Sequence, residues 1–110
     1  MASVLVVCGA GASSTFLVHA LRRQSEVRGI HHTFFPASIS ALTMPLIDVD
    51  VVMVSSHVAD FFDQANAAAI SIGATALQLP SLNFTPAGAD IALNLLDSLT
   101  QTTTESGNHG

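Results

Sequence analysis

The chain has 110 residues, 49% of them hydrophobic, which fits one domain with a dense core and excludes a disordered chain. Eight acidic residues against three arginines, with no lysine, give a net charge of −5 and argue against nucleic acid and anionic membranes as partners. A single cysteine excludes an intrachain disulfide and the apolar runs are too short to cross a bilayer, so we expect a soluble cytoplasmic protein.

The first predicted elements are a strand, a loop of small residues and a helix. Val4 to Val7 is an apolar run typical of a strand buried on both faces of a sheet. The only cysteine, Cys8, ends the strand, and a helical pattern runs from about Ser13 to about Arg28, with Gly29 as its end. The side chains expected to face the core are those of Phe16, Leu17, Ala20 and Leu21.

The segment from Cys8 to Thr15 suits an anionic group bound to sulfur. Gly9 and Gly11 allow consecutive backbone N–H groups to point toward one centre. The positive end of the following helix attracts negative charge and should favour the thiolate of Cys8. Hydroxyls that can cap the helix or contact a bound phosphate follow, from Ser13, Ser14 and Thr15. The alternative is a cysteine that only packs as a small buried hydrophobe.

Other phosphate-binding loops do not fit these residues. A Walker A loop needs lysine, which the chain lacks, and a dinucleotide fingerprint needs glycine where Ser14 stands. A low-molecular-weight cysteine phosphatase has arginine at that same position. The nearest arginine, Arg22, is eight residues further along the helix, about 12 Å at 1.5 Å per residue. The loop therefore favours carrying a phosphoryl group over hydrolysing it.

Two further strands are predicted in the first half of the chain. Ile30 to Phe35 is short and β-prone, and the proline that follows should end it. A short helical turn and a loop, from Ala37 to Leu46, lead to a strand at Val51 to Val54. We interpret Asp48 and Asp50 as a solvated turn and not as a metal pair, because no histidine or further carboxylate clusters with them. No metal site is expected.

The second half adds two helices and one strand. A helix capped by Ser56 should end by Gly73, and its apolar stripe consists of Val58, Phe61, Phe62, Ala65 and Ala69. Ala76 to Leu79 is the fourth strand. Thr85 and Pro86 open a last helix whose stripe consists of Ile91, Leu95 and Leu99.

Four strands alternating with helices predict an open parallel α/β sheet with right-handed crossovers. Residues 1–100 should form this domain, and 101–110 should be a disordered polar tail. In such sheets ligands bind at the carboxyl ends of the strands, which is where the loop after the first strand lies.

The loop Cys-Gly-Ala-Gly-Ala-Ser-Ser-Thr resembles the active-site loop of enzyme IIB components of the sugar phosphotransferase system, lactose/cellobiose (chitobiose) type. That family's pattern is close to Cys-x-Ala-Gly-Met-Ser-Thr-Ser. Ala12 replaces the methionine, while Cys8, Ala10, Gly11 and Ser13 match. Weaker similarity continues over about the first hundred residues. After the third strand the family usually reads Gly-Pro-Gln, where this chain has Ser55, Ser56 and His57.

The resemblance implies a sheet order of 2-1-3-4 with helices on both faces, which would bring Ser55, Ser56 and His57 beside Cys8. It also implies that Cys8, with residues 9–15 as the phosphate cradle, accepts a phosphoryl group from a phosphohistidine of a IIA partner. The group would then pass to a sugar held by a membrane IIC permease, with no cofactor. His57 could bind the phosphate, act as a general base or face a partner, or it could be only a polar residue in a helix's first turn.

Two alternatives stay open from the sequence. One is a cysteine phosphatase or reductase built on a similar loop, which would turn over a generic aryl phosphate. The other is a non-catalytic regulatory domain with the IIB fold, which no IIA protein would phosphorylate. The residues do not indicate which sugar is handled.

Overall fold

A computed structural model describes residues 3–8, 11–30, 32–43, 48–81 and 85–109. The strands are β1 (Ser3–Val7), β2 (Thr33–Ala37), β3 (Val51–Val54) and β4 (Thr75–Gln78). The helices are α1 (Gly11–Arg28), α2 (Phe62–Ile70) and α3 (Pro86–His109), with short 3-10 helices η1 (Ile39–Thr43) and η2 (Ser56–Phe61). Among the described residues, no helix is long and apolar enough to cross a membrane.

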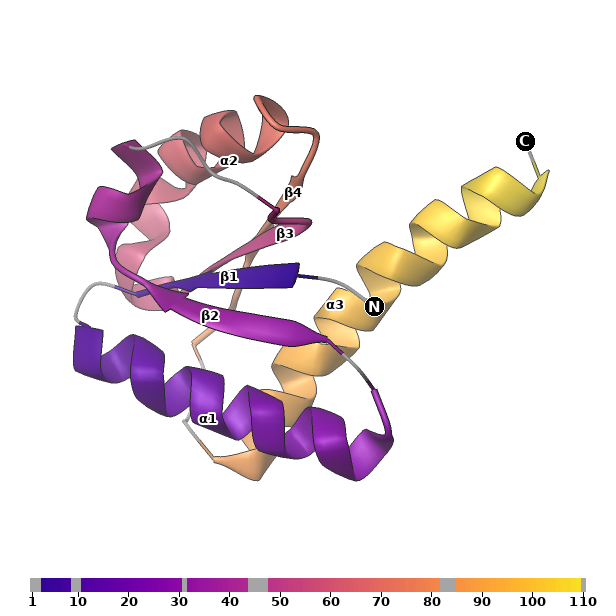
Figure 1. The fold of residues 1–110 in the computed structure, drawn as a ribbon, viewed down its shortest axis with the longest axis horizontal. Helices are drawn as coiled ribbons and strands as arrows, with labels where there is room; N and C mark the ends of the chain where they lie inside the picture. Colours follow the sequence, from indigo (N-terminus) through magenta and orange to yellow (C-terminus); the bar gives the residue numbers. More distant parts are fainter. Residues whose placement is uncertain (1–2, 9–10, 31, 44–47, 82–84, 110) are drawn as a thin grey trace.

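The four strands form one parallel sheet in the order β2-β1-β3-β4, which confirms the predicted fold class and order. Helices α1 and α3 pack on one face of the sheet, and α2 and η1 pack on the other (Figure 1). Because all strands run the same way, their carboxyl ends meet along one edge of the sheet. β1 is central, so the residue that follows it lies between the ends of β2 and β3.

The two central strands are almost completely buried, as their apolar runs predict. Side chains alternate between the faces: Val4 and Val6 contact the core under α1 and α3, whereas Val7, Val52 and Val54 contact the core under α2.

The predicted end of the second strand at Pro36 is wrong, because β2 includes Pro36 and ends at Ala37. β2 is an edge strand, so alternate residues turn their backbone groups away from β1. Ala37 faces β1, since its carbonyl oxygen accepts a hydrogen bond from the Cys8 N–H at 3.2 Å. The nitrogen of Pro36 therefore faces the open edge, where no N–H is needed.

The inward face of α1 differs from the predicted one by a rotation about the helix axis. Leu17, Val18 and Leu21 are buried, whereas Phe16 is 63% exposed. The helix also begins at Gly11, earlier than the predicted start at about Ser13, so the backbone of residues 13–15 lies inside its first turns.

The segment after β3 is not one continuous helix. Ser55, not the predicted Ser56, caps η2, and Val58 has non-helical backbone angles (φ −123°, ψ 30°). The kink separates η2 from α2, so the predicted stripe does not run along one helix. Val58, Ala65 and Ala69 are buried as predicted, but Phe61 is exposed.

Thr85 caps α3 as predicted, since its Oγ1 accepts the Gly88 N–H at 3.3 Å. The predicted stripe is wrong at Ile91, which is exposed. The residues of α3 that are fully buried against the sheet and α1 are Ala89, Ala92, Leu93 and Leu96.

The C-terminal residues 101–109 continue α3 as its last turns, which project beyond the sheet (Figure 1). The sequence predicts a disordered tail for this segment. The domain limit near residue 100 stays a prediction.

Glycines with positive φ terminate α1 and α2, as predicted. Gly29 (φ +71°) directly follows α1, and Gly73 (φ +76°) closes the turn that follows α2. At each end the following N–H reaches back five residues: Ile30 to Ser25 and Ala74 to Ala69, both at 2.8 Å. These are Schellman motifs, which require a left-handed residue and so favour glycine.

An ionic cluster joins the end of α1 to α3. The Arg28 guanidinium lies 3.0 Å from a carboxylate oxygen of Asp90 and 3.4 Å from one of Asp97. Gln24 Nε2 donates to the same Asp90 oxygen at 2.9 Å. The Gln24 amide, and after it the Arg28 guanidinium, hold the pKa of Asp90 below its ordinary value of 3.8.

We expect Asp90→Asn to remove a pH-dependent part of the stability. Because the pKa of Asp90 is lower in the folded state, the unfolded chain binds a proton at this carboxylate more readily than the folded chain does. The stability that Asp90 contributes is therefore fully present above pH 3.8, and it is lost as the pH falls through the folded-state pKa. The free energy of unfolding, measured by urea denaturation from neutral to acid pH, should differ most between wild type and variant at neutral pH. The exposed Asp63→Asn on α2 is the control, and an equal pH dependence in both variants would contradict the assignment.

Candidate functional site

The candidate site lies at the carboxyl edge of the sheet, where Cys8 directly follows β1. The Cys8 N–H donates to Ala37 O at the end of β2, and the Ser55 N–H donates to Val7 O at 3.0 Å. These two bonds continue the ladders by one residue beyond the strands. They place Cys8 between the turns that leave β2 and β3.

Ser55 begins the turn after β3 and is buried beside the end of β1. Its side chain acts to lower the pKa of Cys8. The Ser55 hydroxyl oxygen accepts the His57 N–H at 3.3 Å. Of the three residues expected beside Cys8, Ser55 is buried and bonded to the backbone of Val7, the residue before Cys8, whereas Ser56 is half-buried and His57 is exposed.

Burial raises the pKa of the Cys8 thiol above its ordinary value of 9.0, and the Ser55 hydrogen bond partly opposes this. The prediction that the site favours the thiolate is therefore wrong in direction. Cys8 is 0% exposed and packs in the core with Val4 and Val6. Removing a charged sulfur from water costs more free energy than one hydroxyl donor returns, so the neutral thiol dominates at neutral pH.

The predicted phosphate cradle is described only in part. Gly9 and Ala10 lie outside the described residues. Gly11, Ala12, Ser13 and Ser14 form the first turn of α1, and Thr15 is exposed in the next. The cradle stays a prediction, although the start of α1 places backbone N–H groups after the loop.

The sequence analysis did not identify Gln78, which the structure places at the same edge. Its side-chain amide contacts the turn that carries Ser55, with Nε2 3.1 Å from Val54 O. The available signal was a polar residue between two leucines, two positions before Pro80, in the otherwise apolar run Ala76 to Leu79.

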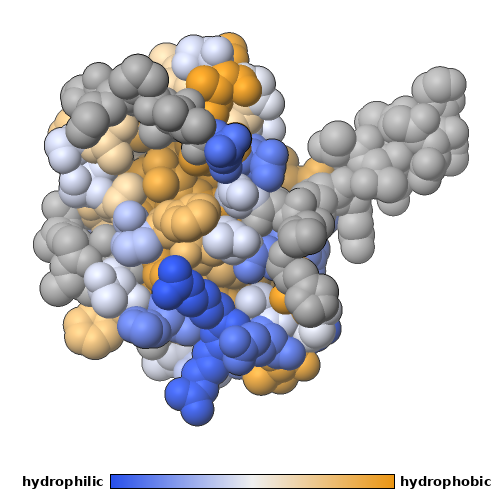
Figure 2. Space-filling model, in the orientation of Figure 1, coloured by the Kyte–Doolittle hydropathy of each residue, from blue (hydrophilic) through white to orange (hydrophobic). Residues whose placement is uncertain are grey.

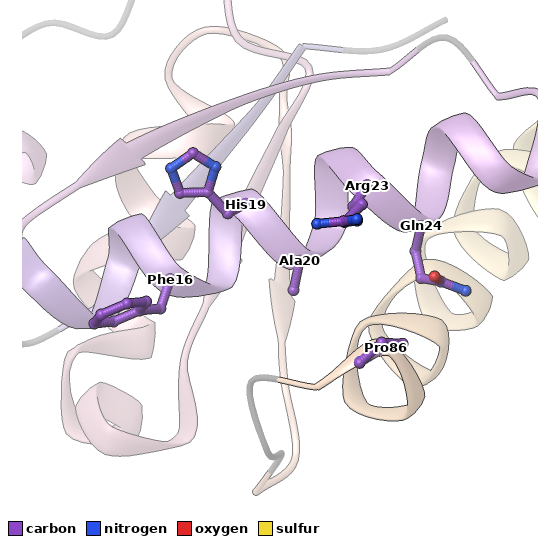
Figure 3. Close-up of a pocket in the computed structure, with 6 residues that line it drawn as sticks. All are labelled: Phe16, His19, Ala20, Arg23, Gln24 and Pro86. Carbon is purple, nitrogen blue, oxygen red and sulfur yellow. The ribbon is translucent and has the colours of Figure 1, made fainter.

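A shallow groove of about 460 Å³ lies between α1 and the start of α3 (Figure 3). Phe16 and Pro86 contribute apolar surface to it, and His19 and Arg23 contribute polar surface. The outer face of α1 is solvated, as predicted. His19 is exposed on it, and hydrophilic side chains gather over α1 on the face shown in Figure 2.

Comparison with known proteins agrees with this geometry. The family model for the lactose/cellobiose-specific IIB subunit of the PTS system matches residues 3–79. A solved structure, the lactose-specific IIB component domain of the phosphoenolpyruvate:carbohydrate phosphotransferase system from Streptococcus pneumoniae, is similar with a TM-score of 0.71 and 14% identity. The alignment covers 87% of this chain and 95% of that one, and at this identity it shows the fold alone. No curated protein sequence matches significantly. The family match spans most of the chain, which therefore belongs to the lactose/cellobiose-specific IIB family of the sugar phosphotransferase system.

Proposed function

We propose that Cys8 accepts a phosphoryl group from a phosphohistidine of a IIA protein and passes it to a sugar bound by a membrane IIC permease. Membership of the IIB family supports a role in phosphotransfer for sugar uptake, and IIB domains work with IIA and IIC components. The observation that carries the proposal is the position of the only cysteine, between the ends of β2 and β3 and directly before the loop into α1. A carrier of this kind acts in the cytoplasm.

The proposed transfer balances without a cofactor. The Cys8 sulfur attacks phosphorus in line with the departing imidazole nitrogen, so an S–P bond forms as the P–N bond breaks. The nitrogen keeps the bonding electron pair and takes up the thiol proton. In the second step a sugar hydroxyl oxygen attacks phosphorus, the S–P bond breaks, and sulfur regains its electron pair and a proton. The protein supplies position and electrostatic stabilisation.

The burial of Cys8 adds one requirement. A sulfur with no exposed surface cannot meet a phosphohistidine, so the site must open when the IIA protein docks.

The proposal is tested by incubating the protein with phosphoenolpyruvate, the general phosphotransferase proteins and a matched IIA protein. Mass spectrometry should find one added phosphoryl group, located on Cys8 by fragmentation under conditions that preserve thiophosphates. Failure of every IIA protein to label Cys8 would favour a regulatory domain. Turnover of an aryl phosphate by the isolated protein would favour a phosphatase, although Ser14 stands where a phosphatase has its arginine.

The exposed aromatic ring of Phe16 is the part of α1 that we expect to contact the IIA protein. Phe16 lies five residues after the start of α1, about 8 Å along the axis, on the side of the groove shown in Figure 3. This end of α1 follows the Cys8 loop, so we expect a IIA protein docked at Cys8 to contact it. Large apolar side chains that become buried supply much of the free energy of docking.

We expect Phe16→Ala to lower kcat/KM for phosphorylation by the IIA protein about tenfold, with kcat little changed. Because this side chain is exposed in the free protein, the melting temperature should stay near that of wild type. Val27→Ala is the matched control, since Val27 is 74% exposed on the last turn of the same helix, far from the loop. Equal effects of the two substitutions would remove Phe16 from the docking surface.

A further inference from the structure

β2 forms one open edge of the sheet, and the backbone of this edge is covered by a side chain of α1. Phe34 in the middle of β2 has no exposed surface, although its neighbours Thr33 and Phe35 are exposed. Backbone groups alternate along a strand, and the Ala37 carbonyl faces β1, so the Phe34 carbonyl faces the open edge. Helix α1 runs beside β2 (Figure 1), and its Arg22 donates from Nη2 to the Phe34 carbonyl oxygen at 2.8 Å.

The segment around β2 has no permanently charged side chain of its own. Residues 29–47 contain no Asp, Glu, Lys or Arg, and β2 begins with Thr-Phe-Phe, three residues of high strand propensity. An uncovered edge of this composition can add a strand from a second chain. Pro36 removes one outward N–H, but both backbone groups of Phe34 point outward as well.

The three arginines of the chain differ in their partners. Arg28 forms ion pairs with Asp90 and Asp97, whereas Arg22 is bonded to a neutral backbone carbonyl. Arg23, the next residue of α1, is exposed, and within the described part of the chain its side chain has no hydrogen bond or ion pair. The bond to the edge strand is therefore specific to Arg22.

This bond lies where a second strand would have to be placed. Neighbouring strands are about 4.8 Å apart, and the Arg22 guanidinium lies 2.8 Å from the outward carbonyl oxygen, within that space. If two copies paired antiparallel about a two-fold axis at Phe34, the two Phe34 residues would exchange their N–H and carbonyl bonds. Both guanidiniums would first have to leave, and their like charges would otherwise meet at the axis.

We propose that Arg22 shields the open edge of β2 and so prevents strand pairing with a second copy of this chain. A second copy is the partner that the edge fits, because identical strands can pair symmetrically about Phe34 and neither has a charged side chain that opposes this. Arg22 and Pro36 then act together, since one covers an acceptor and the other lacks a donor. The proposal concerns the free protein and does not depend on the phosphoryl transfer proposed above.

The substitutions Arg22→Ala and Arg23→Ala form a matched pair for the test. Each removes one positive charge from an exposed position of the same helix, and only the first removes the bond to Phe34. In sedimentation velocity from micromolar to millimolar protein, wild type and Arg23→Ala should remain monomers. The dimer association constant of Arg22→Ala should rise about a hundredfold, because a symmetric dimer no longer has to break two charge-assisted hydrogen bonds, each contributing about tenfold. The lost charge makes the chain more negative, so charge alone would oppose association.

Hydrogen–deuterium exchange at low and high protein concentration locates the contact. Protection of residues 32–37 should rise with concentration in Arg22→Ala and not in Arg23→Ala. Arg22→Met keeps a stem of similar length without an N–H donor, and it serves if circular dichroism shows that the alanine variant is unfolded.

Three results would overturn the proposal. They are a folded Arg22 variant that stays as monomeric as wild type, equal association of Arg22→Ala and Arg23→Ala, and protection gained outside β2. Association of the wild-type protein through β2 would overturn it as well. None of these measurements requires a IIA protein, so a failure of phosphoryl transfer is observed separately.

Discussion

Replacing Cys8 by serine is expected to abolish phosphorylation of the protein by a phosphorylated IIA partner. A serine hydroxyl is a far weaker nucleophile than cysteine, and the chain has no second cysteine to replace it. The rate of labelling should fall on the order of a thousandfold or more, measured by mass spectrometry or by transfer of radioactive phosphate from phosphoenolpyruvate.

The fold of this variant should be retained. Cys8 is fully buried, but the change of one atom leaves no large cavity. We expect a loss of about 1 kcal/mol in the free energy of unfolding. Cys8→Ala is the control for the buried hydroxyl and should be equally inactive. Labelling of either variant at the wild-type rate would refute the role of Cys8.

The largest loss of stability is expected from Phe34→Ala. Phe34 is among the largest fully buried side chains. It lies on the edge strand β2 and belongs to the core cluster that residues of α1 and α3 form on this face of the sheet. Its ring also contacts that of His32 edge-on, with centroids 6.2 Å apart. Removing it leaves a cavity at one side of the sheet, which should lower the free energy of unfolding by about 3–5 kcal/mol in urea denaturation.

The neighbouring phenylalanine is a matched control. Phe35 is 43% exposed because successive residues of a strand point to opposite faces. Phe35→Ala should therefore cost no more than about 1 kcal/mol. Similar losses for the two substitutions would contradict the register in which Phe34 pairs with Val4 and Phe35 with Leu5.

Most of the chain's architecture could be predicted from local patterns. The apolar runs at Val4–Val7 and Val51–Val54 gave the central strands, and Gly29, Gly73 and Thr85 correctly marked helix ends. Such signals are readable because backbone conformation and period depend on neighbouring residues. The loop at Cys8 was sufficient to indicate the IIB family.

What the sequence by itself determined is therefore the order of the strands and of the main helices, and it singled out Cys8 as the proposed acceptor. Only the tertiary structure decided which faces of α1 and α3 turn inward, that β2 passes through Pro36, that the Cys8 sulfur is desolvated, and that Gln78 lies beside the Ser55 turn. These features depend on contacts between segments far apart in the chain. Burial and hydrogen bonding across such contacts are properties of the packed sheet and helices, and no local pattern encodes them.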